Sequence, residues 1–203
     1  MTVNAVGDPQ ALVGSAFHAL ADAVEARGPQ LLEQPSLCTG WTVGHVLAHV
    51  TMAARYSPAE FGAELVAVGY DFEILSQTIA ARDAARTLED VLADLRAETM
   101  ATWVPPGGGP IGALTHVVIH GLDVTAANGM PRSAPDAAAV AVLDALTGGG
   151  VAAHFGVDAS EFRLTATDLG WHHGDGVDLT ASAGDLILAL AGRPRPGIPL
   201  PRV

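Results

Sequence analysis

Two histidines and an aspartate share one face of residues 111–128, a segment that is otherwise mostly apolar. His116, His120 and Asp123 stand at positions i, i+4 and i+7, which form one narrow stripe of an α-helix. Imidazoles one turn apart lie about 6 Å apart along the axis, close enough to bind one metal ion. A solvated face would usually carry Glu, Lys or Arg instead, so we interpret the stripe as a buried polar site.

A second pair of histidines, His45 and His49, is also four residues apart. His49 lies at the flank of the apolar face of its helix, whereas His45 points nearly opposite. We therefore expect His49 to point inward and His45 to be a solvated residue of the first turn. With His116 and His120, His49 would supply three neutral nitrogen ligands. Three such ligands leave one position of a zinc ion open, as in catalytic zinc sites.

Four further polar residues have less defined roles. Asp123 could orient a ligand histidine, although capping or solvent exposure is an equal alternative. Cys38 is the single cysteine, which excludes an intrachain disulfide and a cysteine-built metal site. Because no partner is visible beside Cys38, we interpret it as a small buried residue rather than a nucleophile. His172 and His173 stand in a turn rich in Gly and Asp, where we expect exposed side chains.

The elements that must position these residues are mainly helices. Helical periodicity, N-caps and Gly/Pro breakers predict helices at 8–27, 42–56, 87–103, 111–128 and 135–146. Residues 58–81 are weakly periodic and form either one helix or a helix and a loop. His49 on one helix and two histidines on another fit an antiparallel four-helix bundle with a metal site between facing helices.

A change of composition after residue 131 predicts a second, smaller unit. Residues 162–167 and 176–179 alternate like strands, and Ser182 with Asp185 begins a final apolar helix that ends at Gly192. We therefore predict a mainly α protein with a four-helix bundle at 1–150 and a small α/β domain at 151–203. The glycines at 148–150 would end the bridging helix.

Length, charge and composition limit the possible functions. The 203 residues suffice for one large domain or two small ones, and a mean hydropathy of +0.33 excludes intrinsic disorder. All ten basic residues are arginines, and the net charge of −12 without a basic cluster argues against nucleic acid and anionic membranes. One buried arginine could still bind a small anion. Without a signal peptide or a transmembrane run, we expect a cytoplasmic monomer or homodimer.

Three motifs resemble the mycothiol-dependent maleylpyruvate isomerase family: CTGWTVGHVLAHV, HVVIHGLDV, and LTATDLGWHH followed by VDLTASAGDLILALAGR. They occur in the family's order and span nearly the whole chain. The resemblance implies that the N-terminal domain, residues 1–150, is a DinB-like metal-binding four-helix bundle. The resemblance implies a divalent metal, with zinc as the expected ion, bound by His49, His116 and His120. It also implies mycothiol as the low-molecular-weight thiol. In the isomerase itself, the resemblance places a Glu at the position that matches His116, whereas the set of three histidines is similar to other DinB-like metalloproteins. Because of this departure, the resemblance does not fix the exact reaction.

The resemblance also implies a role for Arg193, which follows Gly192 in a family motif whose arginine serves the active site. Arg193 would bind the carboxylate of the substrate or the transition state. From the residues alone, the first interpretation is an arginine that neutralises the C-terminus of a helix.

The implied mechanism starts from a thiol that zinc converts to a thiolate at neutral pH. Addition of the thiolate to a cis double bond, rotation and elimination would isomerise a maleylpyruvate-like substrate, whereas stable addition to an electrophile would be thiol transfer. Two alternatives stay open: metal-assisted hydrolysis, which lacks its H-E-x-x-H signature here, and a non-catalytic module that binds a metal or small ligand.

Overall fold

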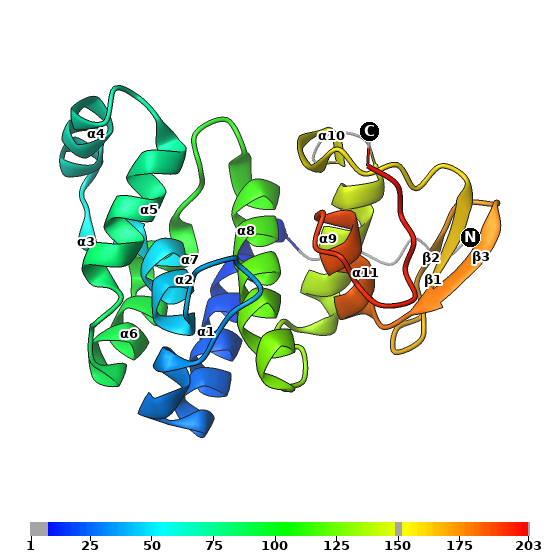
Figure 1. The fold of residues 1–203 in the computed structure, drawn as a ribbon, viewed down its shortest axis with the longest axis horizontal. Helices are drawn as coiled ribbons and strands as arrows, with labels where there is room; N and C mark the ends of the chain where they lie inside the picture. The colour runs from blue at the N-terminus through cyan, green and yellow to red at the C-terminus, as the bar shows by residue number, and fades with distance from the viewer. Residues whose placement is uncertain (1–7, 149–151, 203) are drawn as a thin grey trace.

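The computed structural model describes residues 8–148 and 152–202, which form a group of helices and a small sheet (Figure 1). The expected domain boundary, the glycines at 149 and 150 and the first seven residues lie outside the described residues. The elements are α1 (Pro9–Arg27), η1 (Pro29–Glu33), α2 (Val43–Val50), α3 (Met52–Arg55), α4 (Pro58–Ala67), α5 (Phe72–Asp83), α6 (Leu88–Leu95), α7 (Glu98–Thr102), α8 (Gly109–Thr125), η2 (Ala126–Asn128), α9 (Asp136–Thr147), α10 (Ala152–Phe155), β1 (Phe162–Ala166), β2 (His172–His173), β3 (Val177–Ala181) and α11 (Ala183–Leu190).

The bundle is built around α1 and α8, which pack along each other. The Asp8 carboxylate caps α1 by accepting from the Gln10 backbone N–H, and Pro9 occupies the first turn, where its missing N–H costs nothing. Helices α6 and α7 pack on α1, and α2 packs between α8 and α5. The mainly helical fold with a small C-terminal sheet confirms the predicted fold class.

Two helices differ from the prediction because the chain turns within them. The helix expected at 42–56 begins at Val43 but breaks at Thr51, after which α3 continues to Arg55. The helix expected at 87–103 was also wrong as a single element, because Ala97 adopts an extended conformation. This break turns α7 onto α1, where a Cβ at Gly14 would lie 3.1 Å from the Ala101 Cβ. Tight packing against α1 therefore overrides helical propensity.

The segment 58–81 resolves into two helices, α4 and α5. Gly69 and Tyr70 between them both have positive φ angles, of 67° and 66°. A tyrosine in this left-handed region is uncommon. The turn projects Tyr70 outward, and its side chain is largely exposed.

The C-terminal strands form one three-stranded sheet in the order β2-β1-β3. β1 runs parallel to β3 and antiparallel to β2. His172 and His173 are exposed as expected, but they form edge strand β2 rather than a turn. Trp171 is buried and its indole N–H donates to the Asp144 carboxylate of α9 at 2.8 Å, which links the sheet to that helix.

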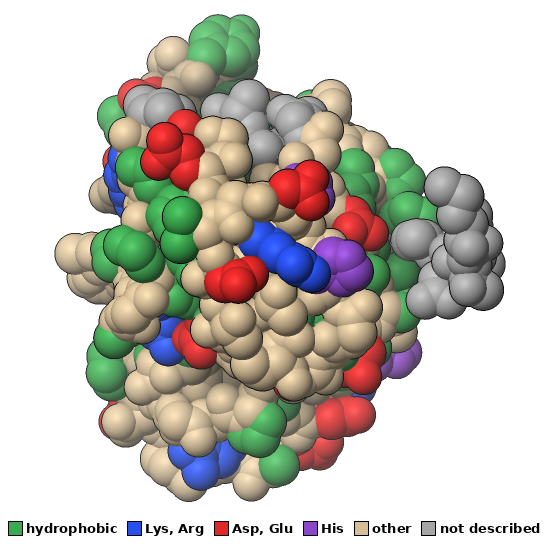
Figure 2. All heavy atoms as spheres, turned by 90° about the vertical axis from the view of Figure 1, so that its right-hand side faces the viewer, with side chains coloured by type: hydrophobic (Ala, Val, Ile, Leu, Met, Phe, Trp, Pro, Cys, Tyr) green, Lys and Arg blue, Asp and Glu red, His purple; other side chains and the backbone are tan. Residues whose placement is uncertain are grey.

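Helix α9 joins the two parts of the molecule, because it packs against α8 on one side and α11 on the other (Figure 1). Buried apolar residues of α1, α8, α9 and α11 belong to one hydrophobic core. Figure 2 shows the face on the side of the sheet, where acidic and basic side chains lie among uncharged ones. Over 8–148 and 152–202, no helix is both long enough and apolar enough to cross a bilayer.

Candidate metal centre

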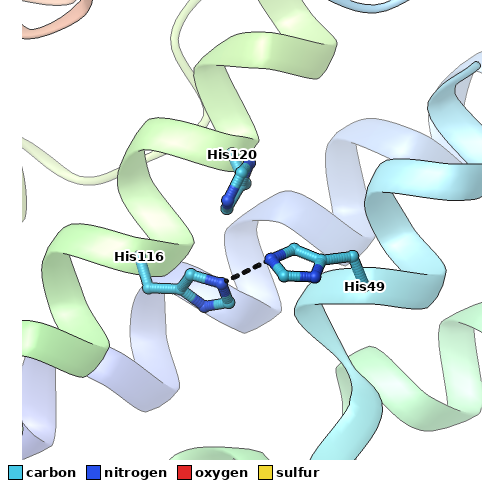
Figure 3. Close-up of side chains that lie close together, drawn as sticks. All are labelled: His49, His116 and His120. Carbon is cyan, nitrogen blue, oxygen red and sulfur yellow. Dashed lines mark hydrogen bonds between the residues drawn. The ribbon is translucent and has the colours of Figure 1, made fainter. Parts of the chain in front are cut away.

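Three imidazoles from two helices converge inside the bundle (Figure 3). His49 comes from α2, and His116 and His120 come from α8. The Nε2 atoms of His49 and His116 are 3.0 Å apart, and one candidate ligand atom from each of the three rings lies within 4.8 Å of the others. The ring centroids are separated by 4.8 to 5.0 Å. The convergence predicted from the spacing is thus present in the structure.

Local sequence determines how α2 presents its histidines. The side chains of Val43, Val46 and Val50 are buried, so the same face carries His49 inward, where it is 7% exposed. His45 lies in the first turn, and its Nδ1 accepts from the backbone N–H of Thr42 at 3.4 Å. His45 stays outside the cluster, as predicted, but it is half-buried and caps the helix rather than being solvated.

Hydrogen bonds at Nδ1 fix the orientation of two of the three rings. His49 Nδ1 lies 2.8 Å from the Ser76 hydroxyl of α5, and His120 Nδ1 donates to Asp123 Oδ2 at 2.9 Å. Both rings therefore have Nε2 free to face the centre of the cluster. This arrangement of a ligand nitrogen and an outward Nδ1 partner is characteristic of metal-binding histidines.

Burial keeps two of the imidazoles neutral. Desolvation, followed by the charge of His120, lowers the pKa of His49 to about 3. The pKa of His116 is also well below its ordinary value, first because of burial and then because of His120 and His49. Its Nδ1 is buried and has no hydrogen-bond partner among the described residues. Neutral imidazoles are the form that binds metal ions.

The donor set fits a divalent metal ion. In a tetrahedral zinc site with Zn–N distances of about 2.0–2.1 Å, two ligand nitrogens lie about 3.3 Å apart. The 3.0 Å between the Nε2 atoms of His49 and His116 is close to this value. Three imidazoles without a carboxylate or thiolate favour zinc or another nitrogen-binding transition metal over Mg²⁺ or Ca²⁺.

A second group of polar side chains lies behind His120. Arg193 Nε and Nη2 donate to the two carboxylate oxygens of Asp123 at 3.0 and 2.9 Å, and the carboxylate has no exposed surface. Although burial alone would raise the pKa of Asp123, the hydrogen bonds from His120 and Arg193 hold it below its usual range. Asp123 is therefore an ionised acceptor that fixes His120.

Cys38 belongs to this group, which its position in the sequence did not reveal. Its Sγ donates to Asp123 Oδ2 at 3.2 Å and lies 4.0 Å from His120 Nδ1. Burial, then the charge of Asp123, raises the pKa of the thiol to about 12. Cys38, His120 and Asp123 could also approach a metal ion. However, Arg193 already occupies both Asp123 oxygens and Cys38 is a neutral thiol, so the three imidazoles are the better donor set.

A cavity of about 450 Å³ opens beside this second group. It is lined by the loop before α2 and by the chain after α11, including Cys38, Arg193 and Arg202. Arg193 also donates through Nη1 to the Ala191 carbonyl. The guanidinium that the family resemblance assigned to the substrate is thus largely engaged within the protein.

Sequence reasoning missed two kinds of residue at the cluster. Ser76 lies in the weakly periodic segment 58–81 and gave no signal. The aromatic side chains Trp41, Phe72 and Trp103 contact the histidine rings from three separate segments, with ring centroids 5.4 to 6.5 Å away. Only tertiary packing brings these residues to the site.

Comparisons with known proteins agree with the motifs. The family model described as the mycothiol maleylpyruvate isomerase N-terminal domain matches residues 13–125, which is more than half of the chain and contains all three histidines. No curated protein sequence matches the chain. A solved structure of a histidine-to-alanine mutant of mycothiol-dependent maleylpyruvate isomerase is similar, with a TM-score of 0.57 and 14% identity over 96% of this chain and 92% of that one. A second structure of that isomerase has a TM-score of 0.49 at the same identity and coverage. The chain therefore belongs to the mycothiol maleylpyruvate isomerase N-terminal domain family.

Proposed function

We propose that this protein is a metal-dependent enzyme that uses a low-molecular-weight thiol, mycothiol, to isomerise a maleylpyruvate-like substrate or to transfer the thiol to an electrophile. The observation that carries this proposal is the convergence of His49, His116 and His120 within 4.8 Å. Family membership and the similarity of the fold to a mycothiol-dependent isomerase support the choice of reaction. We further propose zinc as the metal and the cytoplasm as the location.

The three histidines would hold the metal through nitrogen atoms, with Ser76 and Asp123 orienting two of them. When bound, a divalent cation would stabilise the thiolate form of the cosubstrate at neutral pH. With three protein ligands, a coordination position stays available for a reactant. Cys38 would not compete as a nucleophile, because its raised pKa keeps it protonated.

The proposed reaction adds and removes the thiolate and involves no oxidation or reduction of the substrate. The thiolate sulfur adds to one carbon of the cis double bond, and the electron pair of the π bond moves to the other carbon, where the adjacent carbonyl stabilises it as an enolate. The single bond that remains allows rotation within this adduct. Elimination of the same thiolate then gives the trans isomer. With an electrophile that does not eliminate, a proton from solvent completes the addition and the product is the thiol conjugate.

The contacts of Arg193 support a positioning role in this function. Its guanidinium stabilises the Asp123 carboxylate, which in turn holds His120. The role of Arg193 as a direct clamp for a substrate carboxylate stays a prediction of the family resemblance.

The test combines metal analysis with activity. Purified protein should contain about one metal ion per chain, and the metal-loaded protein should convert maleylpyruvate or diethyl maleate only when mycothiol is present. Conversion without thiol would instead indicate metal-assisted hydrolysis. Bound metal without any turnover would indicate a non-catalytic metal-binding module. A protein that does not bind a divalent metal would contradict the proposal.

A further inference from the structure

An aromatic rim, defined as Trp41, Phe72 and Trp103, surrounds the histidine cluster. The ring of His49 lies 5.4 Å from Trp41 and 6.5 Å from Phe72, and the ring of His116 lies 5.6 Å from Trp103. The Phe72 side chain is 52% exposed. Both tryptophans are partly buried. The rim thus places apolar rings between His49 and His116 and the surface.

Exposed apolar side chains are concentrated on the same two segments. Six large hydrophobic residues are exposed within the described residues. Four of them lie within residues 66–74 and a fifth, Val104, directly follows Trp103; the four are Val66, Tyr70, Phe72 and Ile74. The α4–α5 turn and the loop before α8 that carry them lie at the same end of the bundle, at the top of Figure 1. Clustered exposed apolar residues beside a buried polar site are typical of a ligand-binding surface.

In the proposed function the thiol would take the open position of the metal, so the side chains around the cluster would have to bind the charge of a small dianion. The chain has no lysine. Arg193, which lies behind His120, is already paired with both oxygens of Asp123. Binding of a second carboxylate by Arg193 would compete with that buried pair, whose disruption is costly.

We propose that the substrate of this site is a neutral electrophile with an apolar or aromatic body, which packs on the aromatic rim while its double bond faces the histidines. This inference rests on the proposed function, because it names the substrate class of the same site. Within that function, it favours a reaction on a neutral electrophile over isomerisation of a dicarboxylate such as maleylpyruvate. Each aromatic ring that stacks on a substrate contributes apolar contact area and a preferred orientation.

Diethyl maleate and maleate provide a matched pair of probes, because they have the same cis double bond and differ in charge and apolar surface. We expect thiol-dependent, saturable conversion of diethyl maleate to its trans isomer or its thiol conjugate. Maleate should inhibit this conversion with a KI at least tenfold above the KM of diethyl maleate. A KI equal to or below that KM would overturn the inference and leave the proposed function intact.

Binding to the metal-free protein gives a readout that does not depend on turnover. Two of the three tryptophans belong to the rim, and Trp171 is buried in the C-terminal unit. Diethyl maleate should therefore change tryptophan fluorescence saturably, and Trp171→Phe should keep the change. If Trp41→Phe combined with Trp103→Phe leaves the change in place, the ligand binds elsewhere and the inference is wrong.

A pair of exposed apolar positions supplies the matched variants. Phe72→Ser should raise the KM for diethyl maleate at least fivefold with unchanged metal content, whereas Val177→Ser, at an exposed valine of β3, should leave the KM unchanged. An unchanged KM in Phe72→Ser would overturn the role of the rim. A dimer that Phe72→Ser converts to a monomer with an unaltered KM would instead assign this surface to self-association. Loss of thiol-dependent turnover of every electrophile, with fluorescence binding retained, would remove the proposed function and not the apolar site.

Discussion

Arg193 donates to both carboxylate oxygens of Asp123, across 70 residues of sequence. The pair joins the chain after α11 to α8, directly behind His120. Because Asp123 has no exposed side-chain surface, the removal of Arg193 leaves a buried carboxylate that keeps only the hydrogen bonds from His120 and Cys38.

Arg193→Ala should therefore destabilise the protein by about 3–5 kcal/mol, as expected when one member of a buried ion pair is removed. Urea unfolding followed by circular dichroism measures the loss. Adding Asp123→Asn should recover part of it, because the buried charge that has lost its cationic partner disappears. Arg195→Ala is the control, since its partner Asp185 is 37% exposed, and we expect a change within about 1 kcal/mol. Equal stability of Arg193→Ala and the wild type would mean that the pair contributes nothing.

Loss of one imidazole should abolish tight metal binding while the fold is kept. His120→Ala should retain less than about a tenth of the wild-type metal, because two ligands bind far more weakly than three. Elemental analysis after dialysis gives the metal content, and circular dichroism checks the helices. His18→Ala changes an exposed histidine of α1 and should keep full occupancy. Undiminished metal in the His120 variant would exclude this residue as a ligand.

The hydroxyl of Ser76 should matter for metal affinity although it does not belong to the ligand set. Ser76→Ala removes the group 2.8 Å from His49 Nδ1 and should weaken binding by about 10–100-fold, the usual effect of losing a hydrogen bond to a ligand histidine. Competition with a chromogenic chelator measures the affinity. Ser15→Ala is a suitable control, since that exposed hydroxyl bonds only to a carbonyl of its own helix. An unchanged affinity would show that packing alone holds His49.

The metal-free protein should lose stability as pH falls below about 6.5. The pKa of His49 is about 3 in the folded protein and about 6.5 when unfolded, so between these values the unfolded chain binds the extra proton. Each such histidine contributes a slope of about 1.4 kcal/mol per pH unit, and the lowered pKa of His116 acts in the same direction. Denaturant titrations between pH 7 and pH 4 test this. A free energy of unfolding that stays constant over this range, or an equal slope in His49→Gln, would contradict it.

Cys38 should react slowly with alkylating agents and should be dispensable for chemistry. With its pKa raised from 9.0 to about 12, the thiolate fraction at pH 8 is lower by about two to three orders of magnitude than for a free thiol. Iodoacetamide labelling followed by mass spectrometry gives the rate, with the urea-unfolded protein as reference. Cys38→Ser should keep activity within a fewfold range. Rapid labelling of the folded protein, or an inactive serine variant, would restore Cys38 as a candidate nucleophile.

Sequence reasoning was most successful where one helix carries the information. The spacing of His116, His120 and Asp123 places them on one face, and the apolar neighbours of His49 predict that it points inward. The convergence of the two helices required only that they face each other in a bundle. The fold class followed from the same periodicity and from the alternation of the C-terminal strands.

Contacts between distant segments could not be predicted in this way. No local sequence pattern indicates which residue the Ser76 hydroxyl or the Cys38 thiol contacts. Arg193 was identified only through the resemblance to a family. The break at Ala97 is another example, because close packing of α7 on α1 outweighs a helical pattern that continues through it. In each case, the deciding free energy comes from tertiary contacts.

The position of α9 between α8 and α11 means that the two parts of the molecule share one apolar interior. Heating should consequently melt them together in a single cooperative transition rather than in two steps. A fragment that ends after α9 would expose the apolar surface that α11 normally covers, and would tend to precipitate.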